Sequence, residues 1–111
     1  MEDSSQRVAR ILATCDANSE FPIVVDLVLV GDRIKSSMLF FGIYGKFTSE
    51  HFPFVMKADG TLDFGHDYAE DRYMKCTMRD REIVFGQYFT LEGATQDGPG
   101  TYRIAKIERL I

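Results

Sequence analysis

Residues 23–30 read Ile23-Val24-Val25-Asp26-Leu27-Val28-Leu29-Val30, and this stretch decides the fold. Its β-branched side chains favour extended backbone, so the stretch predicts a β-strand. A strand with one face in water normally alternates apolar and polar residues. Here both alternating faces are apolar except at Asp26. The stretch therefore predicts a strand that needs cover on both sides.

A second run, residues 38–47, has the same property. One face carries Met38, Phe40 and Tyr44, and the other carries Leu39, Phe41, Ile43 and Phe47. Each large apolar side chain left in water forgoes about 1.5–3 kcal/mol. We expect the cover to come either from the sheet curling on itself or from another surface, such as a second subunit, a different protein or a ligand.

Turn residues divide residues 21–110 into hairpins. Asp59-Gly60 is typical of a two-residue hairpin turn. The predicted hairpins are 52–57 with 61–64, 72–78 with 82–85, and 88–92 with 102–109. Antiparallel hairpins in succession leave no place for parallel crossover units. About seven strands result, which predicts a strongly curled antiparallel sheet or a small barrel.

The N-terminal segment has a different period. Four apolar residues recur at the spacing of one helical face: Val8, Ile11, Leu12 and Cys15. Asp3 can cap the start, and Phe21-Pro22 prevents continuation. We predict a helix at about residues 4–17. The expected fold is α+β, mostly β: one domain, residues 1–111, with this helix followed by the β region.

Composition limits the functional classes. The 111 residues are 45% hydrophobic and 27% charged, with a net charge of -4. This balance is typical of a soluble globular domain, and the net negative charge disfavours general nucleic-acid binding. The polar start and the absence of a long apolar run predict a cytoplasmic chain with no membrane segment. The two cysteines, Cys15 and Cys76, lack metal or redox spacing, so we expect both to be reduced and packed.

Two polar features of the sequence have residue types that could take part in chemistry. Asp26 either lies buried with a raised pKa or points outward beside a Lys or Arg, and the second is the more ordinary arrangement. Residues 58–71 carry five acids and no Lys or Arg. Such a segment is usually a solvated loop, with an acidic docking surface or a hard-cation site as the alternatives. We predict no resident metal and no cofactor.

No nucleophile elbow, zinc motif or phosphate loop is present, so the sequence favours a non-catalytic role and leaves the question of enzymatic activity open. The leading hypothesis is a non-catalytic protein-binding module of inhibitor, immunity or adaptor type. Aromatic anchors and surrounding acids would bind a basic protein partner or support self-association as a homodimer. The predicted partner-binding residues are Phe40, Tyr44, Phe52, Asp63, Asp67, Glu70 and Asp71.

Two alternatives stay open. The first is a small-molecule-binding β-barrel, or a small enzyme, with a polar site at the barrel mouth formed by Asp26, Tyr44, His66 and Glu70. The second is a weak surface for single-stranded nucleic acid. Residues Lys75, Thr77, Arg79 and Arg81 would line one face if their strand continued through the turn.

Overall fold

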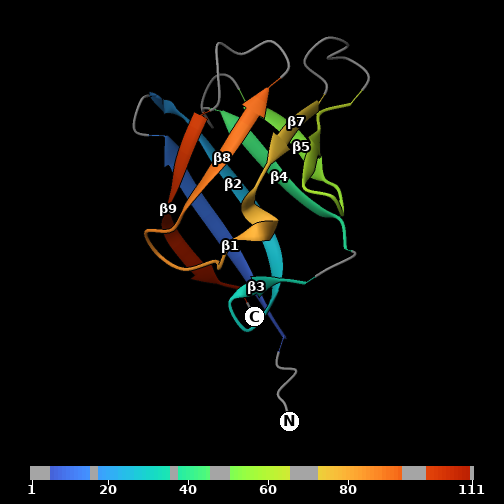
Figure 1. The fold of residues 1–111 in the computed structure, drawn as a ribbon, viewed down its shortest axis with the longest axis vertical. Helices are drawn as coiled ribbons and strands as arrows, with labels where there is room; N and C mark the ends of the chain where they lie inside the picture. Colours follow the sequence, from blue (N-terminus) through green and yellow to red (C-terminus); the bar gives the residue numbers. More distant parts are fainter. Residues whose placement is uncertain are drawn as a thin grey trace.

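The computed structural model describes residues 6–15, 18–35, 38–45, 51–65, 73–93 and 100–110 (Figure 1). These residues form nine β-strands and one 3-10 helix. The elements are β1 Gln6–Cys15, β2 Asn18–Val30, β3 Arg33–Ile34, β4 Phe40–Gly45, β5 His51–Met56, β6 Thr61–Asp63, β7 Tyr73–Cys76, η1 Met78–Asp80, β8 Tyr88–Gly93 and β9 Gly100–Arg109.

Eight of these strands close into an antiparallel barrel. The order around it is β1-β9-β8-β7-β6-β5-β4-β2, and pairing of β1 with β2 closes the circle. Each barrel strand therefore lies beside its neighbours in sequence, while the two-residue β3 pairs with the end of β2. We call the end where β1 starts and η1 lies the base, and the opposite end the rim (Figure 1).

The barrel interior is filled by the inward faces of the strands. Along residues 23–29 of β2 every second residue is fully buried: Ile23, Val25, Leu27 and Leu29. The same alternation buries Phe54 and Met56 on β5, and Phe89 and Leu91 on β8. An eight-stranded barrel is just wide enough for its own side chains to fill it. One face of the predicted double-sided strand is thus covered by the closed barrel.

The prediction of an N-terminal helix was wrong, and with it the α+β fold class: the described residues form an all-β barrel of eight strands rather than a helix and about seven strands. Residues 6–15 form β1, which pairs with β2 on one side and β9 on the other. Its inward residues are Ala9, Ile11, Ala13 and Cys15, all buried, so the period of two prevails. A lone short helix has little stability of its own, whereas this strand closes the barrel. Among the described residues, no helix is long and apolar enough to cross a membrane.

The predicted hairpins were partly correct. The turn at Asp59-Gly60 joins β5 to β6, with Gly60 at φ 93°, and β8 pairs with β9. The hairpin predicted around residues 79–81 was wrong, because β7 ends at Cys76 and pairs instead with β8. The segment after it forms η1, and residues 82–84 form no strand.

The segment that replaces this hairpin closes the base of the barrel. Met78 and Ile83 are buried there. The guanidinium of Arg79 donates hydrogen bonds to the backbone carbonyls of Lys57 (3.0 Å), Lys35 (3.3 Å) and Met38, and it lies 5.2 Å from the ring centroid of Phe40. The Arg79 side chain therefore binds η1 both to the segment between β3 and β4 and to the turn between β5 and β6.

Candidate functional site

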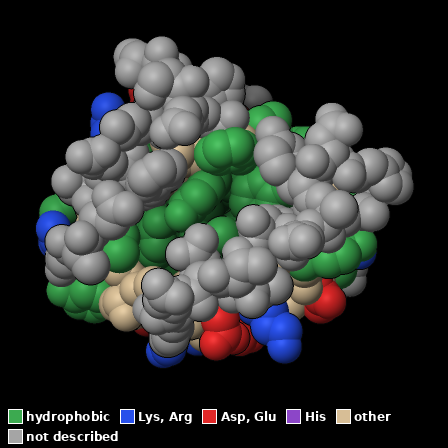
Figure 2. All heavy atoms as spheres, turned by 90° about the horizontal axis from the view of Figure 1, so that it is seen from above, with side chains coloured by type: hydrophobic (Ala, Val, Ile, Leu, Met, Phe, Trp, Pro, Cys, Tyr) green, Lys and Arg blue, Asp and Glu red, His purple; other side chains and the backbone are tan. Residues whose placement is uncertain are grey.

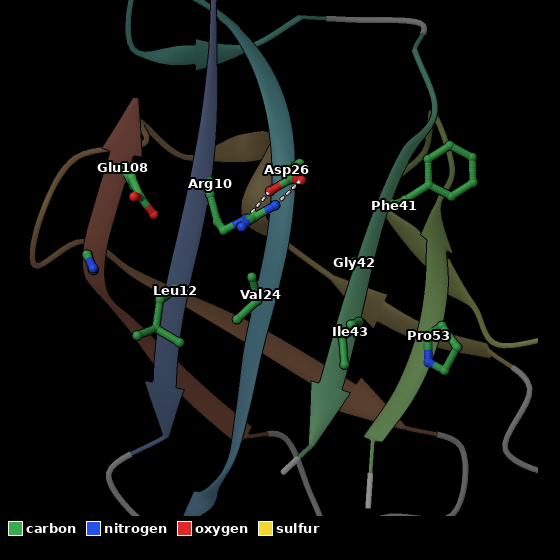
Figure 3. A pocket seen from close by; sticks show the side chains of 10 residues that line it. Arg10, Leu12, Val24, Asp26, Phe41, Gly42, Ile43, Pro53 and Glu108 are labelled. Atoms are coloured by element: carbon green, nitrogen blue, oxygen red, sulfur yellow. Dashed lines mark hydrogen bonds and ion pairs between the residues drawn. The ribbon is translucent and has the colours of Figure 1, made fainter. Parts of the chain in front are cut away.

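The outward face of the predicted double-sided strands carries a groove of about 580 Å³, which we call the outer-wall groove (Figure 3). It crosses strands β9, β1, β2, β4 and β5. The residues that line it are Arg10, Leu12, Val24, Asp26, Phe41, Gly42, Ile43, Pro53, Lys106 and Glu108. Since it is built on paired strands, its lining is held by the barrel.

Strand register arranges the lining in two rows. The first, the apolar row, follows the partners Leu12–Val24, Val24–Ile43 and Ile43–Pro53, and Lys106 beside Leu12 ends it. Figure 3 shows Leu12, Val24, Ile43 and Pro53 on successive strands. The apolar row is thus a continuous strip with one cation at its β9 end.

The second row, the mixed row, contains the charged residues. Phe41 is the register partner of Asp26, Asp26 of Arg10, and Arg10 of Glu108. Arg10 donates two hydrogen bonds to the Asp26 carboxylate, from Nε at 2.8 Å and Nη2 at 3.0 Å (Figure 3). This pairing raises the pKa of the Arg10 guanidinium, and Glu108 adds to the effect. The expectation that Asp26 points outward beside a basic residue is confirmed.

Phe41 and Pro53 also line a second, smaller hollow of about 290 Å³. This second hollow is lined by Phe41, Pro53, Phe54, Val55, Asp63, Phe64 and Gly65. The Phe41 side chain is 68% exposed, and neighbouring Leu39 is 57% exposed. Large apolar groups exposed beside a concave apolar strip are typical of interaction surfaces. The described part of the second face of the predicted strands is therefore only partly covered in the single chain, and Leu39 and Phe41 are its most exposed residues.

The predicted partner-binding residues fall in three places. Phe40, only 4% exposed, and the half-buried Tyr44 and Phe52 lie on the inward faces of β4 and β5. Asp63 lines the second hollow, where its carboxylate accepts a hydrogen bond from the Gly65 backbone N–H. Asp67, Glu70 and Asp71 lie outside the described residues.

The aromatic side chain that sequence reasoning missed is Phe41. Phe40 and Phe41 are consecutive residues of β4, so their rings point to opposite faces of the sheet. A shift of the strand register by one residue would exchange the inward and the outward ring. Because both faces of this strand are apolar, the alternation of residues does not indicate which of the two rings points outward. The available signal was Asp26: as the charged residue of the stretch 23–30 it marks the outward face, and its register partner is Phe41.

The residues of the alternative ligand site are not brought together among those described. Asp26 points to the outer wall, whereas Tyr44 is the register partner of buried Ile23 and faces inward. His66 and Glu70 lie outside the described residues. Inside the rim end, burial raises the pKa of Tyr102, and a side-chain hydrogen bond with Tyr44 raises it further. Aromatic contacts join Tyr44 to Phe64 at 6.2 Å between ring centroids.

The other residues considered for chemistry, which are Cys76, the predicted basic face and possible metal ligands, form no reactive or binding site among the described residues. Burial raises the pKa of the Cys76 thiol to about 11, so it carries a proton at neutral pH and is a poor nucleophile. Arg79 binds backbone carbonyls, and Thr77 accepts a hydrogen bond from the Thr90 N–H, so the predicted basic face is not formed. Across the part of the chain that the structure describes, no group of three or more His, Cys, Asp and Glu could hold a metal ion.

Comparisons with protein-family models, with curated proteins and with solved structures found no match.

Proposed function

We propose that this chain is a non-catalytic protein-binding module, and that its binding surface is the outer-wall groove together with Phe41. The observation that carries the proposal is the exposure of Phe41, 68%, beside a strip of four apolar side chains that the barrel leaves outside. Burying large apolar groups of this kind supplies most of the energy of protein interfaces.

The surroundings of the apolar row support a protein occupant. Interfaces have an apolar centre and a polar rim. Here Asp26, Arg10 and Glu108 lie beside the apolar row on the same wall, and Lys106 ends the row at β9. The wall is built from β-strands, which gives the surface a fixed shape before binding and lowers the entropy cost of association.

A photo-crosslinking phenylalanine analogue tests the proposal when it replaces Phe41 in the chain expressed in its native cells. The matched control replaces Phe85, which is 70% exposed and lies away from the groove lining. We expect protein adducts from position 41 and not from position 85. The absence of adducts at position 41, or equal adducts at both positions, contradicts the proposal.

A second candidate function is the binding of an apolar small molecule at the rim. Figure 2 views the barrel from the rim end and displays apolar side chains between atoms that are not described. Tyr44, Phe52 and Phe64 are half-buried aromatic residues, and Tyr44 and Phe52 are register partners on β4 and β5. An apolar site with a few hydroxyl groups is the usual composition of a ligand pocket.

An environment-sensitive apolar dye distinguishes the two candidates. A rim site predicts saturable dye fluorescence that Phe52→Ala weakens and Phe41→Ala leaves unchanged. Fluorescence that only Phe41→Ala weakens places the dye at the outer wall and contradicts the rim site.

A further inference from the structure

We infer that the occupant of the outer-wall groove is a second copy of this chain, bound in a two-fold symmetric dimer. The inference rests on the proposed function, because it names the partner of that same surface. It is argued from the order of charged and apolar residues along the strands of the wall.

Each of four wall strands contributes two outward residues that are two positions apart. One belongs to the apolar row and the other to the mixed row. The pairs are Lys106 and Glu108 on β9, Leu12 and Arg10 on β1, Val24 and Asp26 on β2, and Ile43 and Phe41 on β4. In a two-fold dimer, when residue i contacts residue j of the other copy, j also contacts i.

Consider a two-fold axis that lies in the plane between the two facing walls. It runs perpendicular to the strands, midway between the apolar row and the mixed row. Each residue then faces the other member of its own pair in the second copy. Lys106 faces Glu108 of the second copy, and Glu108 faces Lys106, so two ion pairs form. Phe41 faces Ile43 in the same reciprocal way, which removes the most exposed ring of the wall from water.

The central strands are compatible with this arrangement. Arg10 and Asp26 face Leu12 and Val24 of the second copy. The Asp26 carboxylate keeps its two hydrogen bonds to Arg10 within its own chain, so it is not buried unpaired. The aliphatic stem of Arg10 can pack on an apolar neighbour while its charged head stays paired.

The other simple orientation is unfavourable. An axis parallel to the strands brings Leu12 opposite Val24 and Arg10 opposite Asp26 of the second copy, but Arg10 and Asp26 are already paired within each chain, so no new ion pair is gained. The same axis places the Phe41 and Ile43 end of one wall on the Lys106 and Glu108 end of the other. Apolar side chains would then desolvate charges without pairing them. The groove contains two cations and two anions, so it offers no excess charge to a strongly basic or acidic partner. This pattern is complementary to itself.

Sedimentation of the full chain over a range of concentrations tests the inference. We expect reversible self-association of the unmodified chain. Lys106→Glu places acid opposite acid twice, and Glu108→Lys places base opposite base twice, so each should weaken self-association by about tenfold or more. The double exchange restores both ion pairs and should restore the dimer.

Mixing the two single variants is the most specific measurement. In the heterodimer, the two acids of one variant face the two bases of the other, so two ion pairs form. The mixture should therefore form a heterodimer more strongly than either variant forms a homodimer. Phe41→Asp should prevent association, and Phe85→Asp, at a comparably exposed ring, should not. Far-UV circular dichroism checks that each variant is folded.

The outcomes separate this inference from the proposed function. A monomer at every concentration, or a double exchange that fails to restore association, overturns the two-fold dimer. Position-41 adducts of about twice 12.7 kDa support it. Adducts with a different protein, together with a monomeric chain, overturn the dimer but leave the proposed function standing. No adduct and no association contradict both.

Discussion

Arg10 on β1 and Asp26 on β2 face each other across the outer wall, joined by hydrogen bonds of 2.8 and 3.0 Å. Their side chains are 50% and 41% exposed. The pair explains how a carboxylate fits within an otherwise apolar stretch: it points to the side that the barrel leaves in solvent, opposite a guanidinium.

Removing this pair should change stability only slightly, because exposed ion pairs are screened by water and salt. Asp26→Asn should lower the midpoint of thermal unfolding at low salt, and the difference should vanish near 1 M NaCl, where the screening length is about 3 Å. A double-mutant cycle with Arg10→Gln measures the pair itself. If the two substitutions are additive at low salt, the pair makes no contribution.

Arg79 should matter far more, although it is one residue of a segment predicted as a turn. Its guanidinium reaches the carbonyls of Lys57, Lys35 and Met38, which a single ammonium group cannot do in the same geometry. Arg79→Lys should lower the free energy of unfolding by about 1–3 kcal/mol, measured by urea denaturation. Arg81→Lys, at an exposed position of the same segment, is the control. Equal losses in both variants contradict the role of Arg79.

The sequence predicted several elements of the β region correctly from local patterns, although the local pattern around residues 79–81 wrongly predicted a hairpin. Strand 23–30, the Asp59-Gly60 turn and the final hairpin needed only β-branched runs and turn residues to be recognised. Residues 6–15 were different, since Val8, Ile11, Leu12 and Cys15 fit a helix while Ala9, Ile11, Ala13 and Cys15 fit a strand. Pairing with β2 and β9, which lies far away in sequence, decided between them.

The candidate site was predictable in kind but not in detail. Strands that are apolar on both faces predicted an apolar surface that the fold does not fully cover. Phe41 and Leu39 are exposed in the single chain. The identity of the outward ring required the register of β4 against β2, which the chain's local pattern does not contain. Distant β9 supplies Lys106 and Glu108, and no local motif connects these residues to the groove.

Gly42 should tolerate no side chain. An added Cβ would lie 2.4 Å from the Val24 carbonyl oxygen and 2.5 Å from the Phe54 ring. We expect Gly42→Ala to cost about 1–3 kcal/mol or more, read from urea denaturation, because one of the two neighbours is backbone and cannot rotate away. Gly100→Ala is the matched control, since its added Cβ would meet no atom closer than 3.4 Å. Adding Phe54→Leu should relieve the loss only in part; a complete rescue would show that the backbone contact is unimportant.

Cys76 should make stability fall at alkaline pH. Burial raises the pKa of its thiol from 9.0 to about 11, so the unfolded chain releases this proton at lower pH than the folded chain does. Its contribution is complete below about pH 9 and declines by about 1.4 kcal/mol per pH unit between about 9 and 11. Cys76→Ala loses packing at neutral pH but lacks this decline, so the stability difference from the unmodified chain should shrink from pH 8 to pH 10.5. Met78→Ala, another buried site on the same segment but without a titratable group, should show a constant difference. If the gap for Cys76→Ala stays equally constant in urea denaturation, the thiol titrates alike in both states and the proposed cause is wrong.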